Sequence, residues 1–159
     1  MKLLDYGFNY KRTTAVNPST GKPIIEAKTG KPMEFFHPVI PLIVSSGKKR
    51  SPPMDGLLDS GSDGVVLPKV LADYLGLELR TAETPMRVAD GKSVERYISR
   101  ANLTIGRAGR YCDPIDAEVT VPALGKPPIL IGRDPIFSLF VITFIEAEKR
   151  IGMKPYRPG

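Results

Sequence analysis

The sequence predicts one all-β domain, a closed or partly open β-barrel with one or two short helices. Three observations predict this fold class. The 159 residues suit a single domain, here residues 1–159. Apolar residues make up 42% of the chain and charged residues 25%, as in a globular protein with a hydrophobic core. The 15 glycines and 16 prolines favour short strands joined by turns over long helices.

Most of the predicted elements are strands. Apolar residues alternate with polar or small ones over residues 4–10, which is the period of a half-buried strand. The C-terminal segments 141–145 and 150–153 predict a hairpin. Short apolar runs between turn residues predict further strands at 39–44, 54–58, 101–105, 117–121 and 129–131.

Two helices and one tight hairpin interrupt these strands. Pro68 and Gly76 are typical of the start and the end of a helix. The predicted apolar face of that helix comprises Val70, Leu71, Tyr74 and Leu75. A second, short helix is predicted from Asp134–Pro135 through Phe140, with Asp134 as its cap. Asp90-Gly91, between the runs 86–89 and 92–98, predicts a two-residue hairpin turn.

Residues 1–35 are interpreted as an N-terminal β-hairpin extension. The tetrapeptide Thr-Gly-Lys-Pro occurs at 20–23 and again at 29–32, which predicts two similar turns. Between them, Ile24-Ile25 predicts the beginning of another strand. A repeat present only twice, at so short a spacing, does not indicate a solenoid.

Several classes of protein and of active site are excluded by what the chain lacks. No apolar run reaches the length of a membrane span, and the N-terminus is charged too early for a signal peptide. The single cysteine, Cys112, excludes an internal disulfide and favours a reducing, cytoplasmic setting. The single histidine, His37, lies in an apolar stretch and is interpreted as a strand or turn residue. We therefore expect no metal site, no cofactor and no membrane partner.

The net charge of +6 raises the question of a nucleic-acid partner. The densest basic cluster, residues 48–50, is interpreted as the solvated tip of a hairpin. A nucleic-acid-binding barrel needs aromatic side chains interleaved with basic ones on one sheet face. The sequence offers only a sparse set of this kind, namely Tyr97, Tyr111, Arg96, Arg100 and Arg110. Nucleic acid is therefore not an expected partner.

Asp59 is the residue most indicative of chemistry, because it places a carboxylate where an apolar strand meets a glycine turn. One interpretation is a structural Asp-Ser-Gly turn that ends the strand. A calcium loop is not expected, because Gly61 and Val70 occupy positions where such a loop needs ligands. The other interpretation is catalysis by two carboxylates that share a proton, one activating a water while the other protonates the scissile carbonyl. The chain has only one Asp-Ser-Gly, so the second carboxylate has to come from another copy across a two-fold axis.

Two segments resemble one family. Residues 57–63, LLDSGSD, are similar to the Asp-(Thr/Ser)-Gly-(Ala/Ser) motif of aspartic proteases, specifically of the single-lobed retropepsin-like group. Residues 129–134, ILIGRD, are similar to the hydrophobic-hydrophobic-Gly-Arg-(Asn/Asp) segment of the same family. The predicted helix and hairpin between them fit the family's order of elements. The resemblance extends from about residue 36 to 153, and residues 1–35 have no counterpart in it.

The resemblance implies a retropepsin-type barrel and peptide-bond hydrolysis by a homodimer, without a cofactor. It implies that Asp59 is the catalytic carboxylate and that Asp63 and Arg133 form a structural ion pair. If this pair is partly buried, removal of Arg133 leaves an uncompensated carboxylate and should cost about 3–5 kcal/mol. The implied supports of the active-site loop are Ser60, Gly61 and Ser62. The implied flap over the substrate comprises Ala89, Asp90, Gly91 and Lys92, without the multi-glycine tip of viral enzymes. The alternative is a catalytically inactive peptide- or protein-binding module on the same fold.

Overall fold

The computed structural model describes residues 1–88 and 90–159. Strands account for 48% of the residues and helices for 11%, so the all-β prediction is confirmed. The helical elements are α1 (Lys69–Leu75) and two single turns, η1 (Arg133–Phe137) and η2 (Glu146–Glu148). The strands in chain order are β1 (Tyr6–Asn9), β2 (Lys11–Thr14), β3 (Glu34–His37), β4 (Val39–Ser46), β5 (Lys49–Arg50), β6 (Met54–Leu58), β7 (Val65–Val66), β8 (Arg80–Thr81), β9 (Met86–Arg87), β10 (Ser93–Val94), β11 (Arg96–Arg107), β12 (Arg110–Tyr111), β13 (Ile115–Pro122), β14 (Ile129–Ile131), β15 (Phe140–Ile145) and β16 (Arg150–Pro155).

Six strands close a barrel in the order β11, β13, β7, β14, β6, β4 and back to β11. The closure depends on the length of β11, which pairs with β13 through residues 96–103 and with β4 through 102–105. In the same barrel β14 runs parallel to β6 and antiparallel to β7. The ends of β6 and β14 therefore lie side by side, and this brings together two segments far apart in the sequence.

The core of the barrel comes from alternating side chains. In β13 the buried residues alternate with the exposed Asp116 and Glu118. Their buried partners are Ile115, Ala117, Val119 and Val121. Burying one such aliphatic side chain stabilises the fold by roughly 1.5–3 kcal/mol. All five predicted apolar runs lie within strands, namely β4, β6, β11, β13 and β14, so these predictions are confirmed.

A second sheet joins the two ends of the chain. The hairpin of β15 and β16 forms as predicted, and β1 adds to it antiparallel, with Tyr6 opposite Met153. Phe8, Phe140, Ile151 and Met153 are buried and belong to the same core as the barrel. Residues 6–9 therefore form part of the folded body, although the sequence grouped them with the extension.

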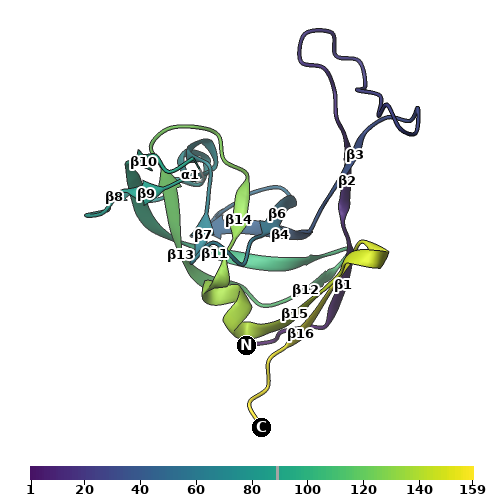
Figure 1. The fold of residues 1–159 in the computed structure, drawn as a ribbon. Coiled ribbons are helices and arrows are strands. Elements are labelled where there is room, and N and C mark those ends of the chain that lie inside the picture. Colours follow the sequence, from purple (N-terminus) through teal and green to yellow (C-terminus); the bar gives the residue numbers. More distant parts are fainter. Residues whose placement is uncertain (89) are drawn as a thin grey trace.

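The rest of the extension is an arm, residues 11–37, that projects from the body (Figure 1). Its stem is the β2–β3 ribbon, in which Lys11 lies opposite His37. Beyond the stem, three backbone bonds form a ring: Ala15 N–H donates to Met33, Ile24 N–H to Ala15 and Met33 N–H to Ile24, at 2.8–2.9 Å. Two loops leave this ring, and each carries one copy of Thr-Gly-Lys-Pro.

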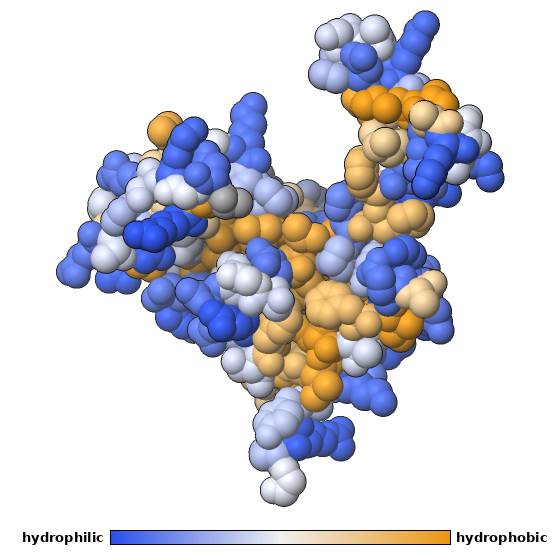
Figure 2. Space-filling model, in the orientation of Figure 1, coloured by the Kyte–Doolittle hydropathy of each residue, from blue (hydrophilic) through white to orange (hydrophobic). Residues whose placement is uncertain are grey.

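The two loops share two backbone hydrogen bonds. Asn17 and Glu26 each donate an N–H to the lysine five positions on and accept the N–H of the glycine four positions on. The predicted pair of similar turns is thus present. The strand predicted at Ile24-Ile25 is wrong, because these residues form the ring and one isolated bridge. Val16 and Ile25 of the arm are about half exposed, at 52% and 54%. Figure 2 shows hydrophobic surface on the projecting arm.

The helices differ from the predictions in detail. Helix α1 is bounded by Pro68 and Gly76 as predicted, but it buries Leu71, Ala72 and Leu75. Val70 and Tyr74 are 76% and 59% exposed, so the predicted apolar face is rotated toward Ala72. The predicted cap at Asp134 is wrong, because Gly132 holds the cap position of η1 and Asp134 has an extended backbone. No helix within the described residues is long and apolar enough to cross a membrane.

Candidate active site

The strand that leads to Asp59 is held on both sides. Strand β6 pairs with β4 and β14, and Gly56 in its middle permits this packing. A Cβ at Gly56 would lie 2.5 Å from Leu42 Cδ2 and 2.7 Å from Ile131 Cγ1. One residue after the strand, the N–H of Asp59 donates to the carbonyl of Ile131 at 3.0 Å. The backbone of Asp59 is therefore fixed by the barrel itself.

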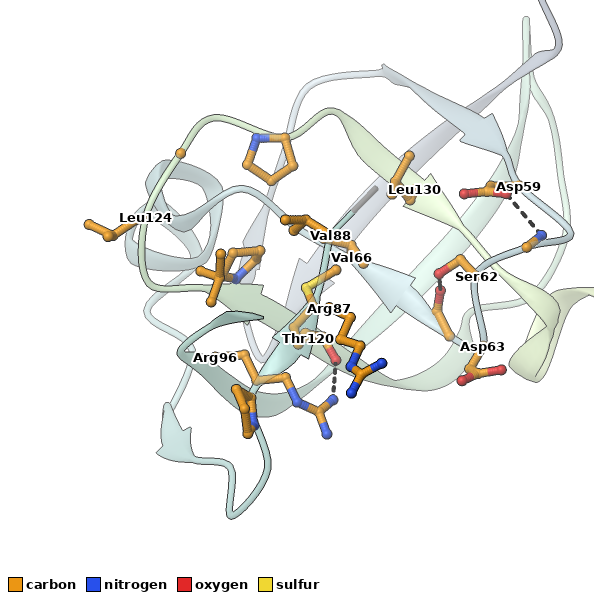
Figure 3. A pocket seen from close by; sticks show the side chains of 18 of the residues that line it. Asp59, Ser62, Asp63, Val66, Arg87, Val88, Arg96, Thr120, Leu124 and Leu130 are labelled. Atoms are coloured by element: carbon orange, nitrogen blue, oxygen red, sulfur yellow. Dashed lines mark hydrogen bonds between the residues drawn. The ribbon is translucent and has the colours of Figure 1, made fainter. Parts of the chain in front are cut away.

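The Asp59 side chain is half-buried and lines a cleft. Its Oδ1 accepts the N–H of Gly61 at 2.9 Å (Figure 3). The Asp59 carbonyl accepts the N–H of Ser62 at 3.1 Å, which closes the loop into a turn. Within the described part of the chain, Oδ2 has no hydrogen-bond partner. One carboxylate oxygen is thus held and the other is free.

The three residues predicted to support this loop differ in their contacts and in their exposure. The Ser62 hydroxyl donates to the Gly64 carbonyl at 2.9 Å and so braces the loop from inside. Gly61 and Ser62 both line the cleft. The Ser60 side chain is exposed, and its hydroxyl makes no hydrogen bond to another described residue. A bracing role for Ser60 therefore requires a partner outside the single chain.

The second motif runs alongside the first. Backbone N–H groups of Gly132, Arg133 and Asp134 donate to the carbonyls of Gly64, Ser62 and Asp63, respectively, at 3.1, 2.9 and 2.8 Å. Gly132 is required at this contact, because a Cβ there would lie 2.3 Å from the Gly64 oxygen. The two motifs found in the sequence thus form one hydrogen-bonded unit, with Asp59 at its edge.

Asp63 and Arg133 are brought together by this unit, and Arg133 Nη2 donates to Asp63 Oδ1. Both side chains are exposed in the single chain, at 92% for Asp63 and 61% for Arg133. The cost of 3–5 kcal/mol that applies to breaking a buried pair does not apply at this exposure. An exposed ion pair contributes about 0–1 kcal/mol.

The cleft beside Asp59 has a volume of about 870 Å³. One wall is the active-site loop, residues 59–64, and the opposite wall is the hairpin of β9 and β10. The segment that joins β13 to β14 contributes Gly125, Lys126 and Leu124, of which Leu124 is labelled in Figure 3. Aliphatic side chains from the barrel, among them Val66 and Leu130, complete the lining. The cleft therefore combines an apolar surface with a carboxylate at one side.

The β9–β10 hairpin carries the predicted flap. It lines the cleft through residues 85–88 and Val94, whereas Asp90, Gly91 and Lys92 are not among the lining residues. The turn of this hairpin is longer than the predicted two residues, because the N–H of Val88 donates to the carbonyl of Lys92. Inside the turn, the N–H of Gly91 donates to the carbonyl of Val88, and Gly91 has a positive φ of 81°. Ala89, the remaining flap candidate, lies outside the described residues.

Other candidate nucleophiles and bases lie away from the cleft. His37 Nε2 is bonded to the Thr13 hydroxyl at 2.9 Å in the stem of the arm. Cys112 is buried, and burial raises the pKa of its thiol, so the thiol stays protonated at neutral pH. No group of three His, Cys, Asp or Glu side chains within the described part converges on a possible metal position. Asp59 is therefore the cleft residue best placed to act as a general acid or base.

Sequence reasoning missed the basic residues of the cleft, which are Arg87, Arg96 and Lys126. The sequence pattern groups Arg96 with Tyr97 as part of a sparse nucleic-acid surface, but neighbouring residues of a strand point to opposite faces. Tyr97 packs against the core, and Arg100 pairs with Asp116. The three cleft residues come from separate segments, so no local pattern connects them.

Comparisons with known proteins agree with this arrangement. A family model described as aspartyl protease matches residues 45–134, more than half of the chain. A retropepsin-like aspartic protease from Rickettsia conorii is similar in fold, with a TM-score of 0.51, 15% identity, and coverage of 95% of this chain and 99% of that one.

Two further solved structures are similar over shorter stretches. EIAV protease, complexed with the inhibitor HBY-793, has 25% identity and a TM-score of 0.45 and covers 65% of this chain and 88% of its own. The retroviral protease-like domain of Ddi1 from Leishmania major has 16% identity and a TM-score of 0.45, with coverage of 77% and 94%. No curated protein matches the chain. From the family match and the barrel, the chain belongs to the aspartyl protease family and has its retropepsin-like fold.

Proposed function

We propose that the protein is an aspartic endopeptidase that hydrolyses peptide bonds as a homodimer. The observation that carries the proposal is the position of Asp59, a half-buried carboxylate with one free oxygen in the wall of a cleft of about 870 Å³. The bond from Gly61 to Asp59 is also what a purely structural turn would have. The cleft is the feature that a structural turn does not need and that an extended peptide substrate does.

The homodimer follows from the number of carboxylates. General acid and general base have to be different groups at the moment of attack, and the single chain supplies one Asp-Ser-Gly. The other carboxylate that lines the cleft, Asp63, is paired with Arg133. A two-fold axis beside Asp59 would place an identical loop opposite and complete the dyad. In such a dimer the exposed Ser60 hydroxyl would bond to the loop of the second copy.

The chemistry then needs no metal or cofactor. Two neighbouring carboxylates cannot both be ionised, so the dyad holds one proton. The ionised Asp59 removes a proton from a water, and the water oxygen forms a bond to the scissile carbonyl carbon. The protonated carboxylate of the second copy gives its proton to the carbonyl oxygen. Collapse of the tetrahedral intermediate breaks the C–N bond, and the leaving amine takes up a proton from the dyad.

The hairpin of β9 and β10 would act as the flap over the bound substrate. It already forms the wall of the cleft opposite the Asp59 loop, through residues 85–88. Asp90, Gly91 and Lys92 of its turn would reach toward the second copy when the site closes. Closure excludes water from a reacting peptide and holds it in an extended conformation.

The test is cleavage of a mixed peptide library by the wild-type protein and by Asp59→Asn. We expect pepstatin-sensitive cleavage by the wild type, with a bell-shaped dependence on pH because the dyad works with one proton. Asp59→Asn removes both carboxylates of a homodimer and should abolish cleavage while the protein stays folded. Full activity in Asp59→Asn would refute the catalytic role, and unfolding would indicate a structural turn. Peptide binding by a wild type that cleaves nothing would indicate the inactive binding module.

A further inference from the structure

The wall of the cleft remote from Asp59 is positively charged. Among the residues that line the cleft, the basic side chains are Arg87, Arg96 and Lys126, and the acidic ones are Asp59 and Asp63. Asp63 is already neutralised by its ion pair with Arg133. Strand β9, the start of β11 and the segment after β13 therefore present positive charge that the chain itself does not balance within the cleft.

Arg96 is held by neutral oxygens only. Its Nε donates to the Thr84 carbonyl at 3.0 Å, and its Nη2 to the Thr84 hydroxyl at 3.2 Å. Its Nη1 donates to the Thr120 hydroxyl at 3.3 Å, which fixes the plane of the guanidinium (Figure 3). A guanidinium has five N–H donors, so two remain for a ligand. The side chain is half-buried, and within the described part of the chain no carboxylate pairs with it.

Arg96 differs from the other arginines of the described chain in being half-buried, whereas the others are exposed. Some exposed arginines, such as Arg80 and Arg107, also have no carboxylate partner among the described residues, and others have one. Arg100, four residues further along β11, pairs with Asp116, and Arg150 pairs with Glu148. Those side chains are more than half exposed and still have carboxylate partners. Arg96 is more desolvated and has none, although a charged group taken out of water gains most from an opposite charge. An anionic group of a bound ligand would supply that opposite charge.

Arg87 strengthens the same part of the cleft. It lies on β9, in the hairpin wall, and its guanidinium projects in the same direction as that of Arg96 (Figure 3). The lining of the same cleft includes the aliphatic side chains Val66, Val88 and Leu130. Aliphatic lining together with two guanidinium groups fits a side chain with a short apolar stem and a terminal carboxylate.

We propose that Arg96 and Arg87 form a subsite for an acidic side chain, so that the protein selects peptides with glutamate or aspartate at one fixed position from the scissile bond. The inference rests on the proposed peptidase function and adds the class of substrate. Arg96 is the fixed, pre-oriented donor, and Arg87 is the exposed donor that the hairpin brings to the bound carboxylate. The free Asp59 and the acidic side chain occupy separate parts of the cleft, so the charges of substrate and dyad do not oppose each other at close range.

The first test is the cleavage profile of a peptide library read by mass spectrometry. We expect acidic residues to be enriched at one position relative to the cleaved bond. For a peptide pair that differs only by Glu or Gln there, kcat/KM should favour Glu by about tenfold, the effect of one charge-assisted hydrogen bond. Cleavage that depends on Asp59 but shows no acidic preference overturns the subsite and leaves the peptidase function standing.

The second test assigns the preference to the two arginines. Arg87→Gln and Arg96→Gln should each reduce the Glu-to-Gln ratio toward one, and Arg87→Glu should shift the preference to Lys or Arg. Arg87 is exposed and makes no hydrogen bond to another described residue, so its variants should fold even if Arg96→Gln does not. Arg100→Gln is the matched control on β11 and should keep the wild-type ratio. An unchanged ratio in both Arg87 variants and in a folded Arg96→Gln overturns the proposal.

A third measurement separates the subsite from catalysis. Immobilised Asp59→Asn protein is exposed to the same defined library, and the retained peptides are identified. Acidic peptides should be enriched on the Asp59→Asn protein, and this enrichment should be lost on the double variant Asp59→Asn/Arg87→Glu. That result supports the subsite even if the wild type cleaves nothing. If peptides are retained without regard to their charge, the subsite is contradicted.

Discussion

Gly132 shows at the scale of single residues why the active-site loop has so little freedom. Its backbone bonds to the Gly64 carbonyl, and the space for a side chain is filled by the carbonyls of Ser62 and Gly64. The same residue is part of the second sequence motif, next to Arg133. The motif is thus explained by close packing of two backbones, independent of any catalytic role.

We expect Gly132→Ala to lower the free energy of unfolding by about 3 kcal/mol and to disturb the Asp59 loop. The reason is that the new Cβ would lie 2.3 Å and 2.5 Å from two backbone oxygens, which cannot move without breaking the loop. Urea unfolding followed by circular dichroism measures the change. Gly152→Ala is the control, because its Cβ would meet nothing closer than 3.8 Å and should change stability by less than about 1 kcal/mol. Equal effects of the two substitutions would contradict this account.

Tyr6 makes the stability of the fold depend on pH in the alkaline range. Its hydroxyl donates to the Ile105 carbonyl at 2.9 Å, and burial raises the pKa of Tyr6 from 10.0 to about 12. The unfolded chain therefore loses this proton at lower pH than the folded chain. The contribution of Tyr6 to stability is complete below pH 10 and is lost as the pH rises from 10 to 12.

We expect Tyr6→Phe to be less stable than the wild type by about 1 kcal/mol at pH 8, the net value of one hydrogen bond. The difference should shrink between pH 10 and 12, because only the wild type has the tyrosine to titrate. Urea midpoints at pH 8, 10 and 11 measure it. A difference that stays constant across this range would show that Tyr6 is not the titrating group.

At the residue scale, the sequence predicted the parts of the site that are contiguous. Asp59, Ser62, Gly132 and Arg133 lie in two short motifs, and the structure places them in one unit. Thr84 and Thr120, which hold Arg96, lie on separate segments and become neighbours only when the hairpin folds back on β13. No local pattern could identify that set.

At the scale of elements, the five apolar runs predicted the barrel strands correctly, whereas the strand at Ile24-Ile25, the length of the hairpin turn and the buried face of α1 were predicted wrongly. Helix α1 has two turns only, so residues i and i+4 define its buried side poorly, and Ala72 takes the place expected for Val70. The arm illustrates a second limit of prediction from sequence. Its two equal turns were predicted from Thr-Gly-Lys-Pro, but the ring that joins residues 15, 24 and 33 depends on contacts among three segments.

The burial of α1 leads to a paired prediction. Leu71→Ala should lower the free energy of unfolding by about 2–5 kcal/mol, because Leu71 is only 6% exposed and its removal leaves a cavity in the core. Val70→Ala, one residue earlier, should change stability by less than about 0.5 kcal/mol, because Val70 is 76% exposed. Thermal or urea unfolding of both variants distinguishes the observed face from the one predicted by sequence. A larger effect for Val70→Ala would restore the sequence-based face.

At the scale of the whole molecule, the single chain is a closed barrel with half of the proposed dyad. The barrel and the β1–β16–β15 sheet share one hydrophobic core. A second copy opposite Asp59 would supply the other half of the dyad. The single Asp-Ser-Gly of the sequence predicts that a second chain is needed, but the geometry of the interface between the two chains could not be derived from one sequence.

The assembly makes a prediction about concentration. Specific activity should fall on dilution below the dissociation constant of the dimer, because each monomer has one Asp59 and cannot complete the site. Sedimentation equilibrium on the same samples should show the monomer appearing over the same concentration range. A strict monomer at every concentration, even with inhibitor, would contradict the dimeric mechanism.

Subunit mixing tests most directly the claim that two copies of Asp59 form one active site. Wild-type and Asp59→Asn chains are unfolded together in varied proportions, refolded at constant total concentration and assayed on one peptide. If each site needs both carboxylates, activity follows the square of the wild-type fraction, because only dimers of two wild-type chains are active. A linear dependence on the wild-type fraction would mean that each chain acts alone, and it would contradict the account.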